Sequence, residues 1–193
     1  MIYEVIVSTK SNDGIPHVVP MGISKKDTYI VLRPFKPSKT LENILRDRSA
    51  VLNVVTDVRI FAGAITGRLN FRIEALPEKK GFFLVDAVSY LVLSLVEVHD
   101  FGGRPSLYMI KESETQLSKF LGFNRAQAAV IEGSILMSRL GMLPQEKIEK
   151  ELEYLGIAIE KTAGKKELQA WEWLIEKYKR FKNKNDGKNK TLS

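Results

Sequence analysis

A change of residue pattern near Glu114 constrains the fold more than any other feature of this chain. Before it, short runs rich in Val, Ile and aromatic residues alternate with Gly, Pro, Asn and Asp, which is typical of antiparallel strands joined by turns. After it, apolar residues recur every three or four positions, which indicates amphipathic helices. The 193 residues are therefore expected to form a β-rich part of about 110 residues followed by a helical part of about 70.

The β-rich part is expected to begin as a meander of three strands. "YEVIVST" and "HVVPMGIS" flank an Asn-Asp-Gly cluster that favours a hairpin, and "TYIVLRPF" follows after a short connection. The next segment, "SKTLENILRDRS", has the apolar spacing of a helix, with Ser38 or Thr40 as its N-cap. Later runs, among them "AVLNVVTDV" and "IFAGAITG", are predicted as further strands of an all-β barrel.

The helical part carries start and stop signals. Asn124 is expected to cap one helix that ends near Gly141, and Pro144 is expected to open a second. A third helix is predicted from an apolar stripe at helical spacing that consists of Leu168, Trp171, Ile175 and Tyr178.

The formal charge of +7 is concentrated at the carboxyl end. Residues 177–193 carry seven Lys or Arg against Asp186 alone, a net charge of +6, so the rest of the chain carries only +1. Such an end is typical of a solvated, disordered tail, and a nucleic-acid partner is not expected.

Composition also excludes several classes of site and location. The chain has no cysteine and two histidines that lie far apart in sequence, so a thiolate or histidine metal site is not expected. Carboxylates could still hold a hard cation, but no metal site is predicted. The first residues lack the pattern of a signal peptide, and the apolar stretch "AVSYLVLSLVEV" is about half the ~20 residues that a membrane-spanning helix needs. A soluble, cytoplasmic protein without a membrane partner is expected.

Sequence motifs of side-chain catalysis are missing. There is no Walker motif and no nucleophile elbow, and neither His17 nor His99 lies in a motif that would recruit a serine. Both histidines are therefore interpreted as structural, and no catalytic residue is predicted.

One segment, "LRPFKPSKT", combines the groups that bind an anion. Arg33 follows an apolar run, two prolines stiffen the connection, and Ser38, Lys39 and Thr40 meet the first turn of a helix, where free N–H groups favour negative charge. A capped helix beside an exposed Arg and Lys gives the same pattern. The residues alone leave both interpretations open.

The order of several segments makes the chain resemble a known family. "PMGI", a strand ending "LRPF", "SKTLENI", "AVLNVVTDVRIFA" and "FNRAQAAVIEGSILMSRLG" are similar to segments of a mainly archaeal family filed as a domain of unknown function. The resemblance covers roughly residues 3–142. It implies an FMN-binding split β-barrel, related in architecture to pyridoxamine-phosphate oxidases and flavin reductases, that forms a homodimer with FMN between the subunits.

The resemblance also implies roles for individual residues. It implies that the backbone of Pro20, Met21, Gly22 and Ile23 runs along the isoalloxazine ring of FMN. It implies that Arg33, Ser38, Lys39 and Thr40 hold the phosphate, and that polar groups of the segment "NVVTD", Asn53, Thr56 and Asp57, reach the pyrimidine edge of the ring. The additional basic and substrate-binding motifs of the pyridoxamine-phosphate oxidases are not evident in this sequence. The resemblance therefore does not imply pyridoxamine-phosphate oxidase activity.

The expected architecture is α+β: an antiparallel split β-barrel of Greek-key type that binds flavin (residues 1–112), a helical C-terminal subdomain (113–182) and a disordered basic tail (183–193). The expected function is FMN binding, with a flavin-dependent oxidoreductase of unknown substrate as the first interpretation. An FMN-binding protein without turnover and a basic nucleic-acid-binding adaptor are the alternatives.

Overall fold

The computed structural model describes residues 1–68, 70–77, 81–100 and 102–190, which form two units. The barrel unit comprises Met1–Thr56 and Phe71–Phe120, and the helical unit comprises Asp57–Asn70 and Leu121–Ser193. Each unit has a hydrophobic core of its own. No helix among the described residues has both the length and the apolar character that crossing a membrane requires.

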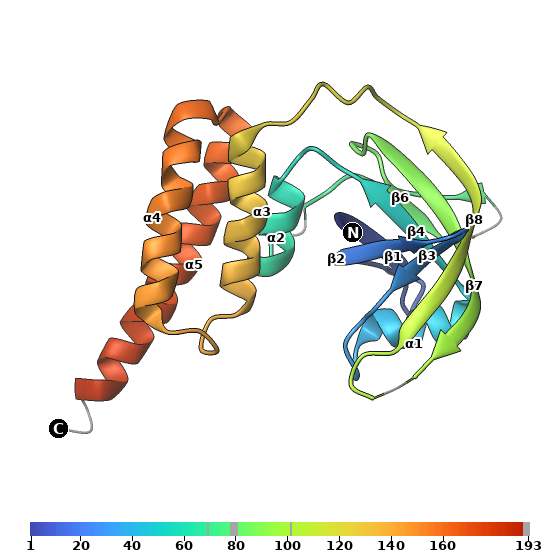
Figure 1. Ribbon diagram of the computed structural model, residues 1–193, viewed down its shortest axis with the longest axis horizontal. Helices are drawn as coiled ribbons and strands as arrows, with labels where there is room; N and C mark the ends of the chain where they lie inside the picture. The colour runs from blue at the N-terminus through green and yellow to red at the C-terminus, as the bar shows by residue number, and fades with distance from the viewer. Residues whose placement is uncertain (69, 78–80, 101, 191–193) are drawn as a thin grey trace. The chain divides into compact units, whose positions relative to one another are not determined.

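In the barrel unit, six strands of the described chain close into an antiparallel barrel in the order β1-β2-β3-β8-β7-β4 (Figure 1). These strands are β1 (Ile2–Lys10), β2 (Pro16–Lys26), β3 (Tyr29–Leu32), β4 (Ser49–Val54), β7 (Ser89–His99) and β8 (Ser106–Gln116). Two short strands, β5 (Ile73–Ala75) and β6 (Phe82–Leu84), pair with each other beside the barrel. The predicted antiparallel barrel is confirmed.

The predicted meander is confirmed by the register of the first three strands. β1 and β2 pair from Ile2 opposite Ser24 to Lys10 opposite Pro16, and Gly14 in the connecting turn has a φ of +76°, which glycine adopts at low cost. β3 continues the sheet by pairing with the end of β2. The barrel closes because β1 also pairs with β4, which in turn pairs with β7.

The barrel interior is filled by apolar side chains from alternate strand positions, as the two-residue period of a strand requires. Buried members from the strands include Val5, Val7, Ile23, Leu32, Leu52, Leu93, Leu107 and Met109. On β2, Val19 and Met21 pack against the same core. The inward face of β2 is therefore apolar from Val19 to Ile23.

Helix α1 (Lys39–Asp47) contributes to this core. Leu41 and Ile44 are buried in it, and the helix packs against β1, β2 and β4. The Oγ atom of Ser38 accepts a hydrogen bond from the N–H of Leu41 at 3.3 Å, so the prediction of Ser38 as N-cap is confirmed. Arg48 ends the helix in a left-handed conformation, with a φ of +56°.

The helical unit contains α2 (Arg59–Thr66), α3 (Arg125–Ser138), α4 (Gln145–Thr162) and α5 (Lys165–Lys190). α3 packs against α2, α4 and α5 (Figure 1). The predicted signals at Asn124 and Pro144 are confirmed, because the Asn124 side chain accepts hydrogen bonds from the first turn of α3 and α4 begins directly after Pro144.

Helix α2 corrects the prediction of a strand over "IFAGAITG". Val58, Ala62 and Ile65 are spaced as on one face of a helix, and all three contribute to the core of the helical unit. The prediction was wrong because the apolar run was assigned from composition, whereas packing against α3 and α5 selects the helix.

The buried face of α5 differs in part from the predicted stripe. Ala170, Leu174 and Tyr178 are buried, and Trp171 and Ile175 pack against the same core. Leu168, by contrast, is 45% exposed. The first position of the stripe was therefore assigned to the wrong face of the helix.

The boundaries of the units also differ from those predicted. The predicted boundary at 112/113 lies within β8, whose pairing with β7 extends to Gln116. Residues 57–70, predicted within the barrel, belong to the helical unit because α2 packs there. The backbone continues as α5 through Lys190 where a disordered tail was predicted from residue 183, and residues 191–193 lie outside the described residues.

Two substitutions on α5 test the assignment of its buried face. Leu174→Ala should lower the free energy of unfolding of the helical unit by about 2–5 kcal/mol, because it removes a fully buried side chain and leaves a cavity. Leu168→Ala makes the same chemical change at an exposed position and should cost less than about 1 kcal/mol. Both tryptophans, Trp171 and Trp173, lie on α5, so urea unfolding followed by tryptophan fluorescence reports on this unit. Equal costs for the two variants would contradict the assignment.

Candidate functional site

The start of helix α1 gathers four of the chain's polar groups on the barrel unit. Ser38 and Lys39 lie at its first turn, and the buried Thr40 follows. The Oγ1 atom of Thr40 lies 3.1 Å from the Nε2 atom of His17, which belongs to β2. The helix start is thereby held against the hairpin of β1 and β2.

The pKa of His17 is affected by burial and by a neighbouring charge. Burial lowers the pKa of the imidazole below its ordinary value of 6.5, and the positive charge of Lys39 lowers it further. The Lys39 ammonium is therefore near enough to His17 to affect its titration. A negative charge bound at this place would act in the opposite direction, since it would favour the imidazolium.

Hydrogen-bond donors remain available at this helix start. Ser38 caps the N–H of Leu41, whereas the N–H groups of Lys39 and Thr40 have no acceptor among the described residues. Ser38 accepts with its oxygen, so its hydroxyl hydrogen can still be donated. Lys39 is exposed and makes no ion pair within the described chain. Two backbone donors, a hydroxyl, an ammonium and the helix dipole thus favour an anion here.

Arg33 lies elsewhere on the barrel unit. Its Nη1 atom donates to Ser24 Oγ at 3.0 Å on β2, and its Nε atom donates to Ser106 Oγ at 3.2 Å on β8. Ser24 and His17 are seven residues apart on β2, which is on the order of 20 Å of extended strand. The structure does not bring the guanidinium into hydrogen-bonding contact with Ser38, Lys39 or Thr40.

The segment Pro20–Ile23 lies on β2 and alternates between the two faces of the sheet. Ile23 is buried in the barrel and Met21 packs against its core, so Pro20 and Gly22 point the other way. A Cβ atom at Gly22 would come within 2.9 Å of the Ile2 side chain, so a larger residue there would displace Ile2. The Ile2 and Glu4 side chains of β1 therefore cover the outward face of β2 at Gly22.

Asn53 is fully buried, and its amide lies between the barrel strands β1 and β4 and the short strand β6. Its Nδ2 atom donates to Ser8 Oγ at 3.0 Å, and its Oδ1 atom accepts from the N–H of Leu84 at 2.9 Å. Ser8 in turn donates to the carbonyl of Phe82 at 2.6 Å. The Asn53 amide therefore joins β1, β4 and β6, and both of its ends have partners.

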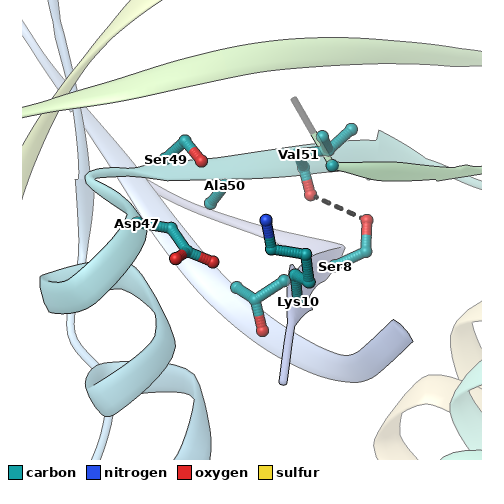
Figure 2. Close-up of a pocket in the computed structure, with 8 residues that line it drawn as sticks. Ser8, Lys10, Asp47, Ser49, Ala50 and Val51 are labelled. Carbon is teal, nitrogen blue, oxygen red and sulfur yellow. Dashed lines mark hydrogen bonds between the residues drawn. The ribbon is translucent and has the colours of Figure 1, made fainter. Parts of the chain in front are cut away.

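A small pocket lies beside Ser8 in the barrel unit (Figure 2). Lys10 and Asp47 line it from β1 and α1, and its volume of about 10 Å³ is room for a single water molecule. Hydrogen bonding to Arg46 lowers the pKa of Asp47, and the charges of Arg46 and Lys10 lower it further. The pocket is too small for an organic cofactor and is interpreted as a structural polar site.

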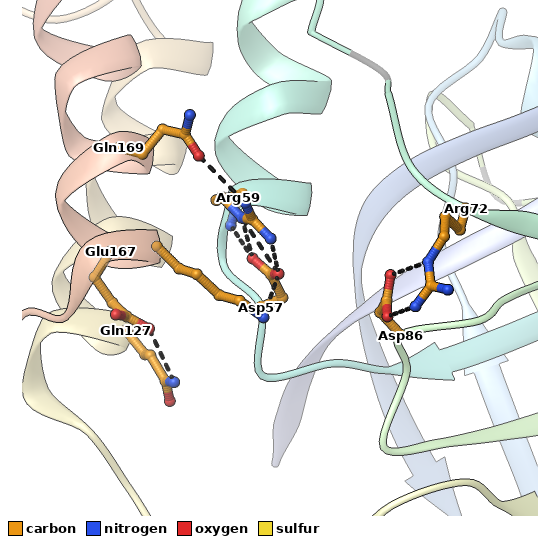
Figure 3. A network of polar contacts seen from close by, with 8 residues as sticks. Asp57, Arg59, Arg72, Asp86, Gln127, Glu167 and Gln169 are labelled. Atoms are coloured by element: carbon orange, nitrogen blue, oxygen red, sulfur yellow. Dashed lines mark hydrogen bonds and ion pairs between the residues drawn. The ribbon is translucent and has the colours of Figure 1, made fainter.

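Asp57 belongs to the helical unit, where two cations hold its buried carboxylate (Figure 3). Arg59 donates from Nε to Oδ1 at 2.9 Å and from Nη2 to Oδ2 at 2.6 Å, and the Nζ atom of Lys166 lies 3.0 Å from Oδ2. Burial alone would raise the pKa of Asp57, but the hydrogen bonds and charges of Arg59 and Lys166 outweigh it and lower the pKa overall. Asp57 thus ties the start of α2 to α5.

Thr56 is half-buried at the end of the barrel unit's first segment, next to Asp57. Of the eleven residues predicted to hold the cofactor, only Ser38, Lys39 and Thr40 gather at the anion-favouring helix start. The contact of His17 with this group was missed, because a strand register and a helix position are both needed to bring residues 17 and 40 together. Among the described residues, no cluster of acidic or imidazole side chains could hold a metal ion.

The architecture defines the class of protein as a split β-barrel of the flavin-reductase type followed by helices. A putative flavin reductase with a split barrel domain from Shewanella frigidimarina matches with a TM-score of 0.52 at 12% identity, over 58% of this chain and 66% of that one. The 2-nitrobenzoate 2-nitroreductase of Pseudomonas fluorescens matches with a TM-score of 0.51 at 16% identity, over 58% and 64%.

The chain belongs to the family described as protein of unknown function DUF447. Residues 3–120 match its N-terminal domain, and residues 124–176 match its second part. The FMN-bound DUF447 protein MM1853 of Methanosarcina mazei is similar with a TM-score of 0.78 at 23% identity, over 91% of this chain and 94% of that one. The uncharacterized protein MJ1453 of Methanocaldococcus jannaschii is 26% identical in an alignment 189 residues long that covers 91% of this chain and 97% of the relative. The predicted family resemblance is confirmed.

Replacing Asp57 tests the role of its carboxylate in the helical unit. At pH 7, Asp57→Asn should lower the free energy of unfolding by about 1–3 kcal/mol, because Arg59 and Lys166 lose a charged acceptor. The lowered pKa means that this stabilisation is present above the ordinary value of 3.8 and is lost as the pH falls through the folded-state pKa. The difference between wild type and variant should therefore shrink from pH 7 towards about pH 2.

Urea unfolding followed by tryptophan fluorescence measures this difference at each pH. Glu153→Gln, at an exposed position of α4 in the same unit, is the matched control and should change stability by less than about 0.5 kcal/mol. A cost for Asp57→Asn that is the same at all pH values would show that the carboxylate charge is not what stabilises the unit.

Proposed function

We propose that this protein binds FMN on its barrel unit. The observation that carries the proposal is the similarity, across 91% of the chain, to a DUF447 protein whose structure holds FMN. The barrel class points the same way, since split barrels of flavin reductases share the fold of this unit. The proposal needs a place for the phosphate and a place for the ring.

The start of α1 fits the phosphate of FMN. The N–H groups of Lys39 and Thr40, the hydroxyl of Ser38 and the ammonium of Lys39 would donate to the phosphate oxygens. Thr40 is buried and contacts His17, so its side chain would position the helix start rather than point into solvent. His17 would therefore contribute to the phosphate site indirectly, by holding Thr40 and the start of α1 in place.

Arg33 is a second candidate cation for the phosphate, but it lies away from the start of α1. Its guanidinium contacts the hydroxyls of Ser24 and Ser106 on an exposed face, and each of these contacts can be exchanged for an oxygen of a ligand. A role of Arg33 in phosphate binding requires its side chain to leave at least one serine. The variants below distinguish Arg33 from Lys39.

The ring is proposed to lie along the outward face of β2 at Gly22, where the exposed Ile2 side chain would have to move aside. Pro20, Met21, Gly22 and Ile23 would support it with their backbone, as the family resemblance implies. Thr56 is the half-buried member of the segment proposed for the pyrimidine edge. Asn53 and Asp57 would need to give up the partners described above, so they contribute least to the proposal.

We also propose that the protein forms a homodimer with FMN between the subunits. Exposed apolar side chains on β1, β7 and β8 support this, since such groups are commonly covered by a partner; they are Ile2, Val96, Val98 and Ile110. Light scattering should give twice the chain mass of 21.9 kDa. A monomer that binds FMN at full strength would count against the dimer.

A flavin-dependent oxidoreductase is the proposed activity. FMN, when bound, supplies hydride or single-electron transfer, and the protein holds and orients it. FMN binding without turnover is the alternative, because the described residues of the barrel unit include no side chain that the geometry marks as a general acid or base. Oxidation of NADH or NADPH by the FMN-loaded protein should exceed that of the same concentration of free FMN. Equal rates would favour the alternative.

Affinity for FMN and for riboflavin tests the phosphate site. Charge-assisted hydrogen bonds contribute about 1.5–3 kcal/mol each, so riboflavin, which lacks the phosphate, should bind more than tenfold more weakly in a fluorescence titration. FMN should also raise the pKa of His17, measured by NMR, because the phosphate charge favours the imidazolium, whereas riboflavin should not. Equal affinities for the two flavins would refute the phosphate site.

Three single substitutions locate the site. Lys39→Ala and Arg33→Ala should each weaken FMN about tenfold or more, because each removes a charged donor. Arg125→Ala, at the exposed start of α3 in the helical unit, removes the same charge and should change the affinity less than about threefold. Loss of affinity only in Lys39→Ala would confine the phosphate to the start of α1. Greatest loss in Arg125→Ala would move the site to the helical unit.

A further inference from the structure

A basic pocket in the helical unit is not used by the proposed flavin site. It has a volume of about 520 Å³ and lies where the ends of α2 and α3 meet the second half of α5. Four cationic side chains line it: Arg68, Lys177, Arg180 and Lys184. Its remaining lining includes the apolar Met137, Leu140 and Phe181.

The charges of this pocket are not balanced by the described carboxylates. Glu176 forms ion pairs with Arg68 at 2.6 Å and with Arg180 at 3.7 Å. Lys177 and Lys184 have no acidic partner within the part of the chain whose side chains are described. Four cations against one carboxylate leave a surplus of three positive charges around one hollow. Such a concave, charged surface concentrates anions.

The helix ends explain only part of this charge. α2 and α3 both end at the pocket, and one cation near each end would complement the helix dipoles. Arg68, directly after α2, also stacks on the ring of Trp173 at 5.3 Å, so it is already used for packing. The three cations of α5 exceed what the two helix ends require.

The hydroxyl groups of the pocket restrict how a ligand can be held. Thr66 donates to the carbonyl of Ala62 at 2.8 Å, and Ser138 donates to the carbonyl of Ile135 at 2.7 Å. Their hydrogens are therefore committed to their own helices. Donors to a ligand have to come from the lysines and arginines, which suits a group with several negatively charged oxygens.

We propose that this pocket binds a phosphorylated small molecule that has an apolar or aromatic part, such as a nucleoside diphosphate. The phosphates would be held by Lys177, Arg180 and Lys184, and the base or another flat group would contact Phe181. A volume of about 520 Å³ lies within the usual range of small-molecule sites, about 300–1,000 Å³. A small molecule is favoured over a nucleic acid because the cations surround a hollow with an apolar lining rather than form an extended stripe.

Calorimetry with ADP, inorganic pyrophosphate and adenosine tests the proposal on the full-length protein without added FMN, since FMN also carries a phosphate and a flat ring and could compete. Saturable binding of ADP is expected, tighter than that of pyrophosphate, with no binding of adenosine alone. NMR shifts of backbone amides should be largest between residues 177 and 184, which separates this pocket from the start of α1. The result does not depend on whether the protein binds FMN, because the shifts show directly whether ADP lies in this pocket or at the start of α1.

The double variant Lys177→Glu/Lys184→Glu should weaken ADP at least tenfold. The matched control, Lys179→Glu, lies on the same helix outside the pocket lining and should change the affinity less than twofold. Lys179 and Lys184 are exposed and Lys177 is half-buried with its charge lining the pocket, so far-ultraviolet circular dichroism should be unchanged in both variants. The proposal is overturned if ADP and pyrophosphate do not bind, if the control weakens ADP as much as the double variant, or if the shifts fall outside the pocket. If single-stranded oligonucleotides bind more tightly the longer they are, the cations form a nucleic-acid-binding surface instead.

Discussion

Closure of the barrel through β1 is the constraint on which the rest of the barrel unit depends. β1 pairs with both β2 and β4, although β4 is not the next strand after β3 in the barrel. The chain must therefore cross from β3 to β4 along one end of the barrel, and α1 makes that crossing. Asn43 donates to Thr9 Oγ1 at 3.0 Å and Thr40 contacts His17, so the crossing helix is fixed to the first hairpin. The donors at the start of α1 occupy a defined place because the strand order requires a helix there.

Polar side chains in this molecule divide by what they contact. Asn53 and Asp57 are buried, and their polar atoms serve the barrel and the helical unit respectively. Ser38 and Lys39 lie at a helix start that still has donors to offer. The family resemblance implies a cofactor role for residues of both kinds and does not distinguish between them. Burial and hydrogen-bond partners are what separate a residue that holds the fold from one that can hold a ligand.

Local signals were sufficient for much of the fold. The Asn-Asp-Gly turn, the cap at Ser38, the cap at Asn124 and the start after Pro144 each depend on residues within one turn, and each was predicted correctly. The errors concern long-range packing. Whether residues 60–67 form a strand or a helix depends on α3 and α5, and the buried face of α5 depends on its neighbours. Likewise, the cluster at α1 could be predicted as a motif, but the contact of His17 with it required the strand register.

The division of the helical unit between two stretches of chain has a consequence for synthesis on the ribosome. All strands of the barrel have been made once Gln116 is added, whereas α2, made earlier, packs against helices that come later. Ala62 on α2 and Leu174 on α5 share one core but are separated by 112 residues (174 minus 62). At about 5–20 residues per second, the apolar face of α2 waits on the order of 5–20 s for this partner. The nascent chain of this protein therefore exposes an unfinished helical core after all strands of the barrel have been made, and slow translation after residue 120 prolongs that exposure.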